Sequence, residues 1–585
     1  MSFAPSAPVG NHRNLLRSLR VFGAEQLQKR EEQAFLVLSL LIGVLTGAVV
    51  VAFILLTERL GMRLYPVDGA AWRRVAIPIG GSLLMGFLLY RFFPGARGSG
   101  VPQTKAALFA RDGNISLRTV LGKFFCTSTT LACGIPLGRE GPSVQVGAGI
   151  ASVLGRSLGL RPERVRQLIP VGAAAAVAAA FNTPMAAVLF ALEEVMGDLH
   201  APVLGSVVLA SATSWATMRM LLGNSPLFHV PQYELVHPME LGIYALLGLA
   251  GGLVSAGFTR TLLRLRKGFQ CLPGKSRWAH PVAGGLVVGL MGWFVPQALG
   301  VGYSWVGQAL NGAMALRLLL ILLVLKLVGV AVSYASGNAG GIFGPSLFLG
   351  AMLGGAIGTV AHQLLPGCTA TPGAYALVGM GTLFAGIVRA PMTSVLMIFE
   401  MTRDYAVIVP LMIANLTSLF IARRLQRQPI YEALSEQDGI HLPAGRGQEE
   451  TSGHTIGEIL HEPAEVLGGR LRVREAVETI SASAAHIWPV LRGEYLAGIV
   501  TRELLLKEVE AGNSDERLEN LVGVETMPHL HRDHPLHLAL ERMSRAQLDL
   551  LPVIHRADAH TLEGVVSLQD ILTAYGVQNT NSAQL

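Results

Sequence analysis

An uncharged apolar run, AFLVLSLLIGVLTGAVVVAFILL, fills positions 34–56. As a helix, its 23 residues are enough to cross the roughly 30 Å hydrocarbon layer of a bilayer. Similar stretches follow near 75–93, 117–135, 167–196, 201–222, 240–257, 279–299, 315–335, 346–364, 373–400 and 406–422. Lipid offers the backbone no hydrogen-bond partner, so each spanning segment has to satisfy its own polar groups. Together with a mean hydropathy of +0.47, this predicts an all-α multi-pass membrane bundle.

Basic residues around these runs predict the orientation. Residues 1–33 are polar and basic and lack the cleavage site of a signal peptide, so the first span is expected to be retained. Loops rich in Lys and Arg stay in the cytoplasm, which places both termini there. We expect the chain to reside in the cell (inner or plasma) membrane. The residues concerned are Arg13, Arg17, Arg20, Lys29, Arg30, Arg260, Arg264, Arg266, Lys267, Lys275, Arg277, Arg423, Arg424 and Arg427. The net charge of +7 needs no nucleic-acid partner to explain it.

The apolar part of the chain is duplicated. Two pairs of segments match: GREGPSVQVGA with GIFGPSLFLGA at 138–148 and 341–351, and TPMAAVLFALEE with APMTSVLMIFEM at 183–194 and 390–401. Their offsets of 203 and 207 residues predict repeats at about 34–222 and 239–422, within a membrane domain at 34–427. Paired apolar segments interrupted by Gly and Pro indicate a transporter binding site where the repeats meet.

Each copy of the glycine–proline motif is expected to begin a helix. Glycine lets the backbone turn and approach a ligand, and Pro142 and Pro345 suit a first helical turn, where a missing N–H costs nothing. The free N–H groups and the positive dipole end, about half a charge, then attract an anion. The alternative is that these glycines only permit close helix packing. Duplication of the whole frame favours the anion site.

After the bundle the chain becomes charged and contains a second repeat. IWPVLRGEYLAGIVTRELLL at 487–506 resembles LLPVIHRADAHTLEGVVSLQDIL at 550–572, and each predicts strand, turn, strand and helix. We expect a linker, two α/β domains and a tail at 428–450, 451–511, 517–577 and 578–585. The four cysteines show no CxxC pairing and the sixteen histidines no cluster, so no metal site and no required cofactor are predicted.

Four stretches resemble the CLC family of chloride channels and proton-coupled chloride transporters: GSGVP at 98–102, GREGP at 138–142, GGIFGP at 340–345 and Tyr431 in QPIYEAL. The tail resembles a pair of CBS domains, regulatory modules often joined to that family. The resemblance covers about residues 34–577, and these motifs in this order are specific, whereas GSGVP alone is weak. It implies an all-α multi-pass membrane bundle of two inverted repeats with broken helices, plus a cytoplasmic α/β CBS domain pair, in a homodimer.

The same resemblance assigns the chloride-binding residues. They are Ser99, the backbone amides of Ile342 and Phe343, and Tyr431. Serine at position 99 resembles chloride-preferring members, whereas members with proline there favour nitrate. Serine also commonly caps helices, so both roles stay open for Ser99.

Glu140 corresponds to the external gate of the family. An ionisable residue inside the membrane is costly and by default indicates function. A carboxylate at a helix N-terminus competes with chloride, and its protonation releases the site, which couples proton movement to anion movement. The alternative is a buried glutamate paired with its neighbour Arg139, although adjacent residues at a helix start do not usually face each other.

Glu193 and Glu194 lie in an apolar segment with no lysine or arginine nearby. In the family's exchangers the second glutamate of such a pair is the internal proton acceptor, hence Glu194, and passive channels commonly have a non-acidic residue there. Glu193 and Glu400 are equivalent in the two repeats, so at least one is expected to be structural, and a place on the dimer surface stays open for Glu194. Lys123 and Lys326 are expected to reach the membrane interface.

CBS domains that bind adenosyl ligands carry Ser or Thr and, three residues later, an Asp that bonds the ribose. The second copy has Ser567 and Asp570, whereas the first has Thr501 but Leu504 in place of the aspartate. An adenine nucleotide, ATP or AMP, is therefore expected at one good site at most, and a structural role in dimer contact is the alternative. No Walker lysine or catalytic constellation is present, so no enzyme is expected.

The favoured function is exchange of chloride for protons across the lipid bilayer, with Glu140 as the gate and Glu194 as the internal proton acceptor. Each subunit of the dimer has its own pathway. The alternatives are a passive voltage- or pH-gated chloride channel and a membrane-anchored nucleotide sensor whose bundle has lost transport. Intact motifs in both halves argue against the sensor.

Overall fold

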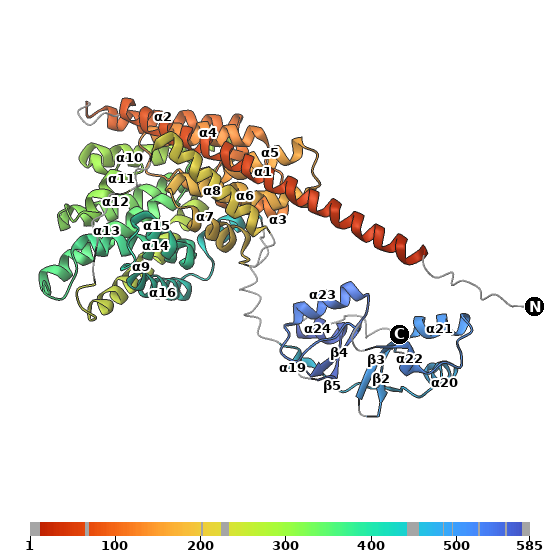
Figure 1. Ribbon diagram of the computed structural model, residues 1–585. Helices are drawn as coiled ribbons and strands as arrows, with labels where there is room; N and C mark the ends of the chain where they lie inside the picture. Colours follow the sequence, from red (N-terminus) through yellow and green to blue (C-terminus); the bar gives the residue numbers. More distant parts are fainter. Residues whose placement is uncertain are drawn as a thin grey trace, which may run out of the picture. The chain divides into compact units, whose positions relative to one another are not determined.

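The computed structural model describes residues 12–64, 70–199, 203–223, 228, 233, 235–440, 455–483, 485–493, 495–523, 527–555 and 558–575, with only the backbone of residues 12–32. The basic side chains predicted to face the cytoplasm between positions 13 and 30, and the tail at 578–585, lie outside the described residues. The chain divides into two compact units, residues 1–445 and 446–585, which are described separately (Figure 1).

The first unit is built from helices. Its first half contains α1 (His12–Leu64), α2 (Arg73–Arg91), η1 (Pro94–Ala96), α3 (Val101–Ala110), α4 (Leu117–Ala132), α5 (Glu140–Ser157), α6 (Pro162–Phe181), α7 (Pro184–Phe190), η2 (Ala191–Met196) and α8 (Leu204–Leu222). Its second half contains α9 (Glu240–Gln270), η3 (Gly274–Ser276), α10 (Pro281–Phe294), η4 (Pro296–Ala298), α11 (Tyr303–Leu310), α12 (Leu316–Ala335), α13 (Phe343–Leu364), α14 (Pro372–Val388), α15 (Pro391–Thr402), α16 (Ile408–Leu425) and α17 (Ile430–Gln437).

Six helical segments of the described chain are long and apolar enough to cross a membrane. They are Gln33–Leu64, Pro162–Phe181, Glu240–Gln270, Leu316–Ala335, Phe343–Leu364 and Ile408–Gln437. Helix α13, which begins at the second glycine–proline motif, is almost entirely buried within the protein. Helix α13 is therefore enclosed by protein, whereas the segments Glu240–Gln270 and Ile408–Gln437 are less than half buried.

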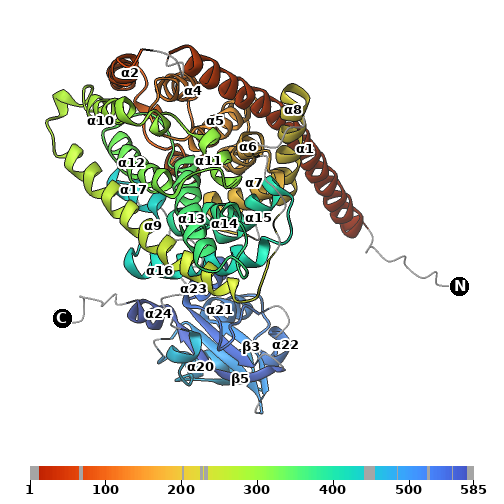
Figure 2. The same cartoon turned by 90° about the vertical axis from the view of Figure 1, so that its left-hand side faces the viewer.

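The two halves repeat the same packing. Helix α5 packs against α6 and α1 against α8, and in the second half α13 packs against α14 and α9 against α16. Elements also contact their own counterparts across the repeat, α2 with α10 and α7 with α15 (Figure 2). A pseudo-twofold axis between the two halves places elements that lie near it next to their own counterparts in this way.

Two predicted spans, 167–196 and 373–400, are each broken into two helices. The breaks lie at Asn182 (φ 61°) and Arg389 (φ 70°), equivalent residues in the two repeats, both in the left-handed conformation. The prediction of continuous spans is wrong because the proline two residues further on begins a new helix. The residue before a proline also avoids the α conformation.

The predicted linker at 428–450 begins too early. Helix α17 packs against α3 and α9, and Ile430, Tyr431 and Leu434 are buried there. These apolar residues form one face of a short amphipathic helix, which is why the segment joins the bundle. Residues 441–454 lie outside the described chain.

The second unit has two halves, each with a strand pair followed by a helix, as predicted. Its elements are α19 (Ile456–Ile459), β1 (Leu467–Gly468), α20 (Val473–Ile480), β2 (Ile487–Arg492), β3 (Tyr495–Thr501), α21 (Arg502–Glu510), α22 (Leu518–Leu521), α23 (Leu536–Ala546), β4 (Leu550–His555), β5 (Asp558–Ser567) and α24 (Leu568–Ala574). Strand β2 pairs antiparallel with β3 and parallel with β1, and β4 pairs antiparallel with β5.

The two halves of this unit exchange their first segments. Ile456 packs in the core of the second half, with Leu551 and Val566, whereas Leu518 packs in the core of the first half. The boundaries predicted at 451–511 and 517–577 therefore do not separate the two cores. Each leading segment buries its apolar side chains on the other half.

Candidate anion pathway

The two glycine–proline turns meet inside the protein. The Gly138 amide donates to the Gly341 carbonyl and the Gly341 amide to the Gly138 carbonyl, both at 2.7 Å. A Cβ atom on Gly138 would lie 2.4 Å from the Glu140 carboxylate and 2.9 Å from Cδ of Pro345, so glycine alone fits there. The glycines bring α5 and α13 into contact. They therefore permit close helix packing and also bring the two helix starts together.

Glu140, the first residue of α5, lies at the amide end of α13. The residue is 0% exposed, and its carboxylate accepts a hydrogen bond from the Gly344 amide at 3.1 Å. The Tyr303 hydroxyl donates to the other carboxylate oxygen. Arg139 instead pairs with Glu58 at 3.0 Å, so the alternative of a Glu140–Arg139 pair is wrong.

Several buried donors in this region have no partner in the described chain. The amides of Ile342 and Phe343 make no hydrogen bond to a described residue. The hydroxyls of Ser99 and Tyr431 are also buried, and neither has a hydrogen-bond partner among the described residues. Buried polar groups are nearly always paired. This set of donors therefore fits an anion that accepts hydrogen bonds from it.

Ser99 packs directly onto the first turn of α5. A Cβ atom on Gly141 would lie 2.9 Å from the Ser99 hydroxyl oxygen. Gly100, not Ser99, is the N-cap residue of α3, so the capping role considered for Ser99 is wrong. The Ser99 amide donates to the Tyr334 hydroxyl at 3.2 Å, whereas the Ser99 hydroxyl has no partner among the described residues.

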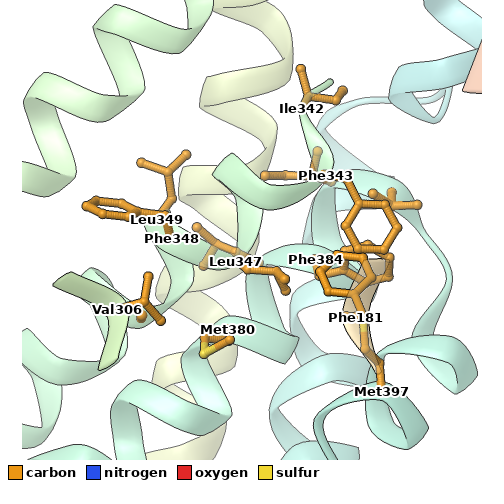
Figure 3. Close-up of a cluster of buried hydrophobic side chains, with 14 of the residues drawn as sticks. Phe181, Val306, Ile342, Phe343, Leu347, Phe348, Leu349, Met380, Phe384 and Met397 are labelled. Carbon is orange, nitrogen blue, oxygen red and sulfur yellow. The ribbon is translucent and has the colours of Figure 1, made fainter. Parts of the chain in front are cut away.

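An aromatic cluster holds the start of α13. The Phe343 ring lies 4.8 Å from that of Phe181, 5.5 Å from Phe190 and 4.5 Å from Phe384, between ring centroids. Figure 3 shows the rings of Phe343, Phe384 and Phe181 gathered below Ile342. Close ring packing of this kind restricts side-chain motion, so the amide end of α13 is presented on a rigid base.

A basic cavity borders the loop that contains Ser99, although Ser99 itself is not one of its lining residues. This Ser99 cavity has a volume of about 460 Å³ and is lined by Gly98, Tyr334, Arg97 and Arg277 among others. Burial, and then the charge of Arg277, lowers the pKa of Arg97 from its ordinary value. Cations that repel one another at the mouth of a cavity attract small anions into it.

Glu194 lies in η2, a single π-helical turn. It is 6% exposed and pairs with Lys105 of α3 at 3.0 Å. The sequence shows no lysine or arginine near it, and the fold supplies one from a distant helix. π-helical turns occur frequently at functional sites. The alternative placement of Glu194 on a subunit surface does not fit its burial inside this chain.

Glu193 and Glu400 hold the two broken helices together. The Glu193 carboxylate accepts a hydrogen bond from the Thr393 amide at 2.8 Å, at the start of α15. Glu400 in turn accepts one from the Ala186 amide at 2.7 Å, at the start of α7. Carboxylates satisfy the free amides of a helix N-terminus. Both members of this pair are therefore structural.

Lys123 and Lys326 do not reach the membrane interface, contrary to prediction, because both are fully buried. Their ammonium groups donate to backbone carbonyls, Lys123 to Gly98 at 2.5 Å and Lys326 to the equivalent glycine at 2.6 Å. The carbonyls belong to a further repeat, F-x-P-x-A-x-G-x-G at 92–100 and 294–302, which the sequence comparison missed. The first copy contains Ser99, and Tyr303 directly follows the second copy. Recognising this repeat would therefore have pointed from Ser99 to Tyr303.

In the second unit the predicted nucleotide residues make helix caps. The Thr501 and Ser567 hydroxyls cap α21 and α24. Asp570 accepts from the Ser567 hydroxyl at 2.6 Å and contacts His461 at 2.9 Å. Burial by itself would raise the pKa of Asp570, but the hydrogen bonds with Ser567 hold that pKa below its ordinary value. The pKa of His461 is raised, first by a hydrogen bond with the Glu462 carbonyl and then by Asp570, although burial acts in the opposite direction.

Three histidines of the second unit pack edge to face in a row, so the expectation of no histidine cluster is wrong. Ring centroids lie 5.2 Å apart for His529 and His531 and 4.9 Å apart for His531 and His534. The sequence HLHRDH carries this signal. Within the described ranges, no group of three or more ligating side chains is arranged to hold a metal ion.

The chain is similar to known families and proteins. The family described as voltage gated chloride channel matches residues 81–423, and the CBS domain family matches residues 524–576. A ClcB-like protein of Ralstonia nicotianae, whose name refers to a chloride channel, is 35% identical over 381 residues, 64% of this chain and 88% of that protein. A Vibrio campbellii protein named H(+)/Cl(-) exchange transporter ClcA is 34% identical over 367 residues, 61% of this chain and 78% of that protein.

Solved structures agree with these matches. A slow cyanobacterial Cl⁻/H⁺ antiporter has a TM-score of 0.64 and 28% identity, over 69% of this chain and 97% of that one. A eukaryotic CLC transporter shares the fold, with a TM-score of 0.60 and 21% identity over 92% of this chain and 97% of that one. The chloride channel match covers more than half of the chain and includes both glycine–proline turns. This chain is therefore a multi-pass membrane protein of the voltage-gated chloride channel, or CLC, family.

Proposed function

We propose that the protein exchanges chloride for protons across the membrane. The observation that carries this proposal is the Glu140 carboxylate at the amide end of α13, in the position of an anion. A carboxylate and a chloride cannot share the same donors, so one leaves when the other binds. Protonation removes the charge of Glu140 and weakens its hold on the Gly344 amide, and chloride then takes its place. A similar antiporter structure and a similar protein named as an exchanger support this reading.

Chloride is bound by partial charges rather than by a full positive charge. Its ligands are the hydroxyls of Ser99 and Tyr431 and the amides of Ile342 and Phe343, whose lack of partners among the described residues supports the assignment. Donors of this kind replace water around an ion and still let it leave. The arginines of the Ser99 cavity raise the local anion concentration at its mouth.

Glu194 accepts the proton at the internal end of the pathway. Helix α3, which begins just after the Ser99 loop, packs against both η2, which contains Glu194, and α17, which contains Tyr431. One observation favours the second candidate function, a passive chloride channel. The ion pair with Lys105 at 3.0 Å stabilises the ionised form of Glu194 and opposes proton uptake.

The protein resides in the cell (inner or plasma) membrane with both termini in the cytoplasm. Arg266 near the basic end of α9 pairs with Asp438 after α17 at 2.5 Å, so the positive loop and the exit of the chain share one face. The homodimer rests on family membership alone. Ser567 and Asp570 of the CBS pair are proposed to bind the ribose of ATP or AMP.

Simultaneous measurement of chloride efflux and pH in proteoliposomes tests the exchange. A chloride gradient should drive protons uphill, against their own gradient. A passive channel would show chloride flux alone. A membrane-anchored sensor would show neither flux.

A further inference from the structure

Tyr303 directly follows the second copy of a duplicated loop whose first copy contains Ser99. The frame F-x-P-x-A-x-G-x-G ends at Gly100 in the first half and at Gly302 in the second. The first copy presents Ser99 to the pathway, and the second leads directly into α11, whose first residue is Tyr303. Lys326 holds the second loop by its carbonyls. The start of α11 is therefore anchored as firmly as the Ser99 loop.

The Tyr303 side chain has two neighbours at its ring and one partner at its hydroxyl. Its ring meets that of Phe228 edge-on at 5.7 Å, and the Arg139 guanidinium lies 5.4 Å from its centroid. Arg139 is held in turn by Glu58 at 3.0 Å. The Tyr303 hydroxyl donates to the Glu140 carboxylate.

Tyr303 also separates Glu140 from a cavity. This Tyr303 cavity has a volume of about 460 Å³ and is lined by Glu58, Arg139, Phe228 and Tyr303, together with residues of α11 and the turn after it. Glu140 is absent from its lining and is 0% exposed. A carboxylate that leaves the amide end of α13 toward this cavity has to break its bond with the Tyr303 hydroxyl.

We propose that the Tyr303 hydroxyl is a latch that holds the ionised Glu140 carboxylate at the amide end of α13 and so sets how strongly it competes with chloride. The proposal rests on the proposed function, in which Glu140 is that competitor. A hydrogen bond to a charged group contributes enough that its loss shifts an equilibrium about tenfold or more. Tyr303→Phe removes the hydroxyl and keeps the ring, so the competitor is weakened without disturbing the packing.

Chloride titration calorimetry on the purified full-length protein at neutral pH tests the latch. Tyr303→Phe should bind chloride about tenfold more tightly than the wild type. Glu140→Gln, which lacks the charged competitor, should also bind more tightly, and adding Tyr303→Phe to it should change nothing further. Tyr233→Phe is the matched control, because this buried hydroxyl bonds the Leu310 carbonyl at the other end of α11. Its chloride affinity should equal that of the wild type.

Two results would overturn the latch while leaving the gate intact. One is wild-type affinity in Tyr303→Phe when Glu140→Gln binds tightly. The other is an equal change on adding Tyr303→Phe to either background, which would indicate a structural role of the ring. Wild-type affinity in Glu140→Gln itself would refute the competing carboxylate and, with it, the latch.

Discussion

Replacing Gly138 with alanine should drive the Glu140 carboxylate out of the anion site. The new Cβ would lie 2.4 Å from a Glu140 oxygen and 3.0 Å from the Gly344 amide nitrogen, so it intrudes between the two. The side-chain end of Glu140 yields more easily than the backbone of α13. Losing a charge-assisted hydrogen bond costs about 1.5–3 kcal/mol, which weakens the carboxylate as a competitor by about 10- to 100-fold.

Gly138→Ala should therefore bind chloride at least about tenfold more tightly and transport it with less proton movement per chloride. Calorimetry and the paired proteoliposome assay measure the two effects. Gly341→Ala is the matched control, because its Cβ would meet Pro142 at 3.1 Å and does not touch Glu140. Overpacking costs each variant about 1–3 kcal/mol of stability, so melting temperatures should fall in both.

The steric argument is refuted if Gly138→Ala folds and keeps the wild-type chloride affinity and proton-to-chloride ratio. It is also refuted if Gly341→Ala shows the same uncoupling, because the effect would then come from strain at the bridge between the two turns.

Three further predictions concern carboxylates and a histidine. Glu140→Ala should keep chloride movement and lose its proton coupling, and coupled, pH-dependent flux in that variant would contradict the gate. Glu194→Gln should stop proton transfer while anions still pass, and an unchanged proton-to-chloride ratio would leave Glu194 as the ion-pair partner of Lys105 alone. The pKa of His461 is raised in the folded protein, where this residue pairs with Asp570. The pairing therefore contributes its full stabilisation at pH values below the ordinary histidine pKa, and this stabilisation is lost as the pH rises through the raised pKa. Its side chain is 48% exposed, so the loss should stay below about 1 kcal/mol. The melting temperature of the second unit should therefore fall slightly from pH 6 to pH 8.5 in the wild type and stay level in His461→Gln, and equal profiles would refute the linkage.

Local features of the chain were open to prediction from sequence. The frame around Pro142 and Pro345 predicted two helix starts, and each proline lies in the first turn of α5 or α13. The equivalence of Glu193 and Glu400 predicted a structural role, and both carboxylates cap helix starts of the opposite repeat. These predictions succeeded because they depend on backbone chemistry within a few residues.

Contacts between distant segments were missed. Lys105 lies 89 positions from Glu194, and no periodicity links the two. Lys326 looked like a residue that reaches the membrane surface, because the carbonyls that bind it belong to a loop whose place only the fold reveals. The further repeat at 92–100 and 294–302 was visible in the letters and would have led to Tyr303.

The sequence by itself determined that this chain crosses a membrane as helices, that its membrane part is duplicated, and that a glutamate stands at a helix start. Those properties follow from apolar length, repeated frames and the backbone preferences of Gly and Pro. Only the tertiary structure decided which donors and charges surround that glutamate: the Gly344 amide and Tyr303 hydroxyl that hold it, and the Glu58 that takes Arg139 away from it. Electrostatic and hydrogen-bond partners act over a few ångströms in space, and spacing along the chain does not specify them.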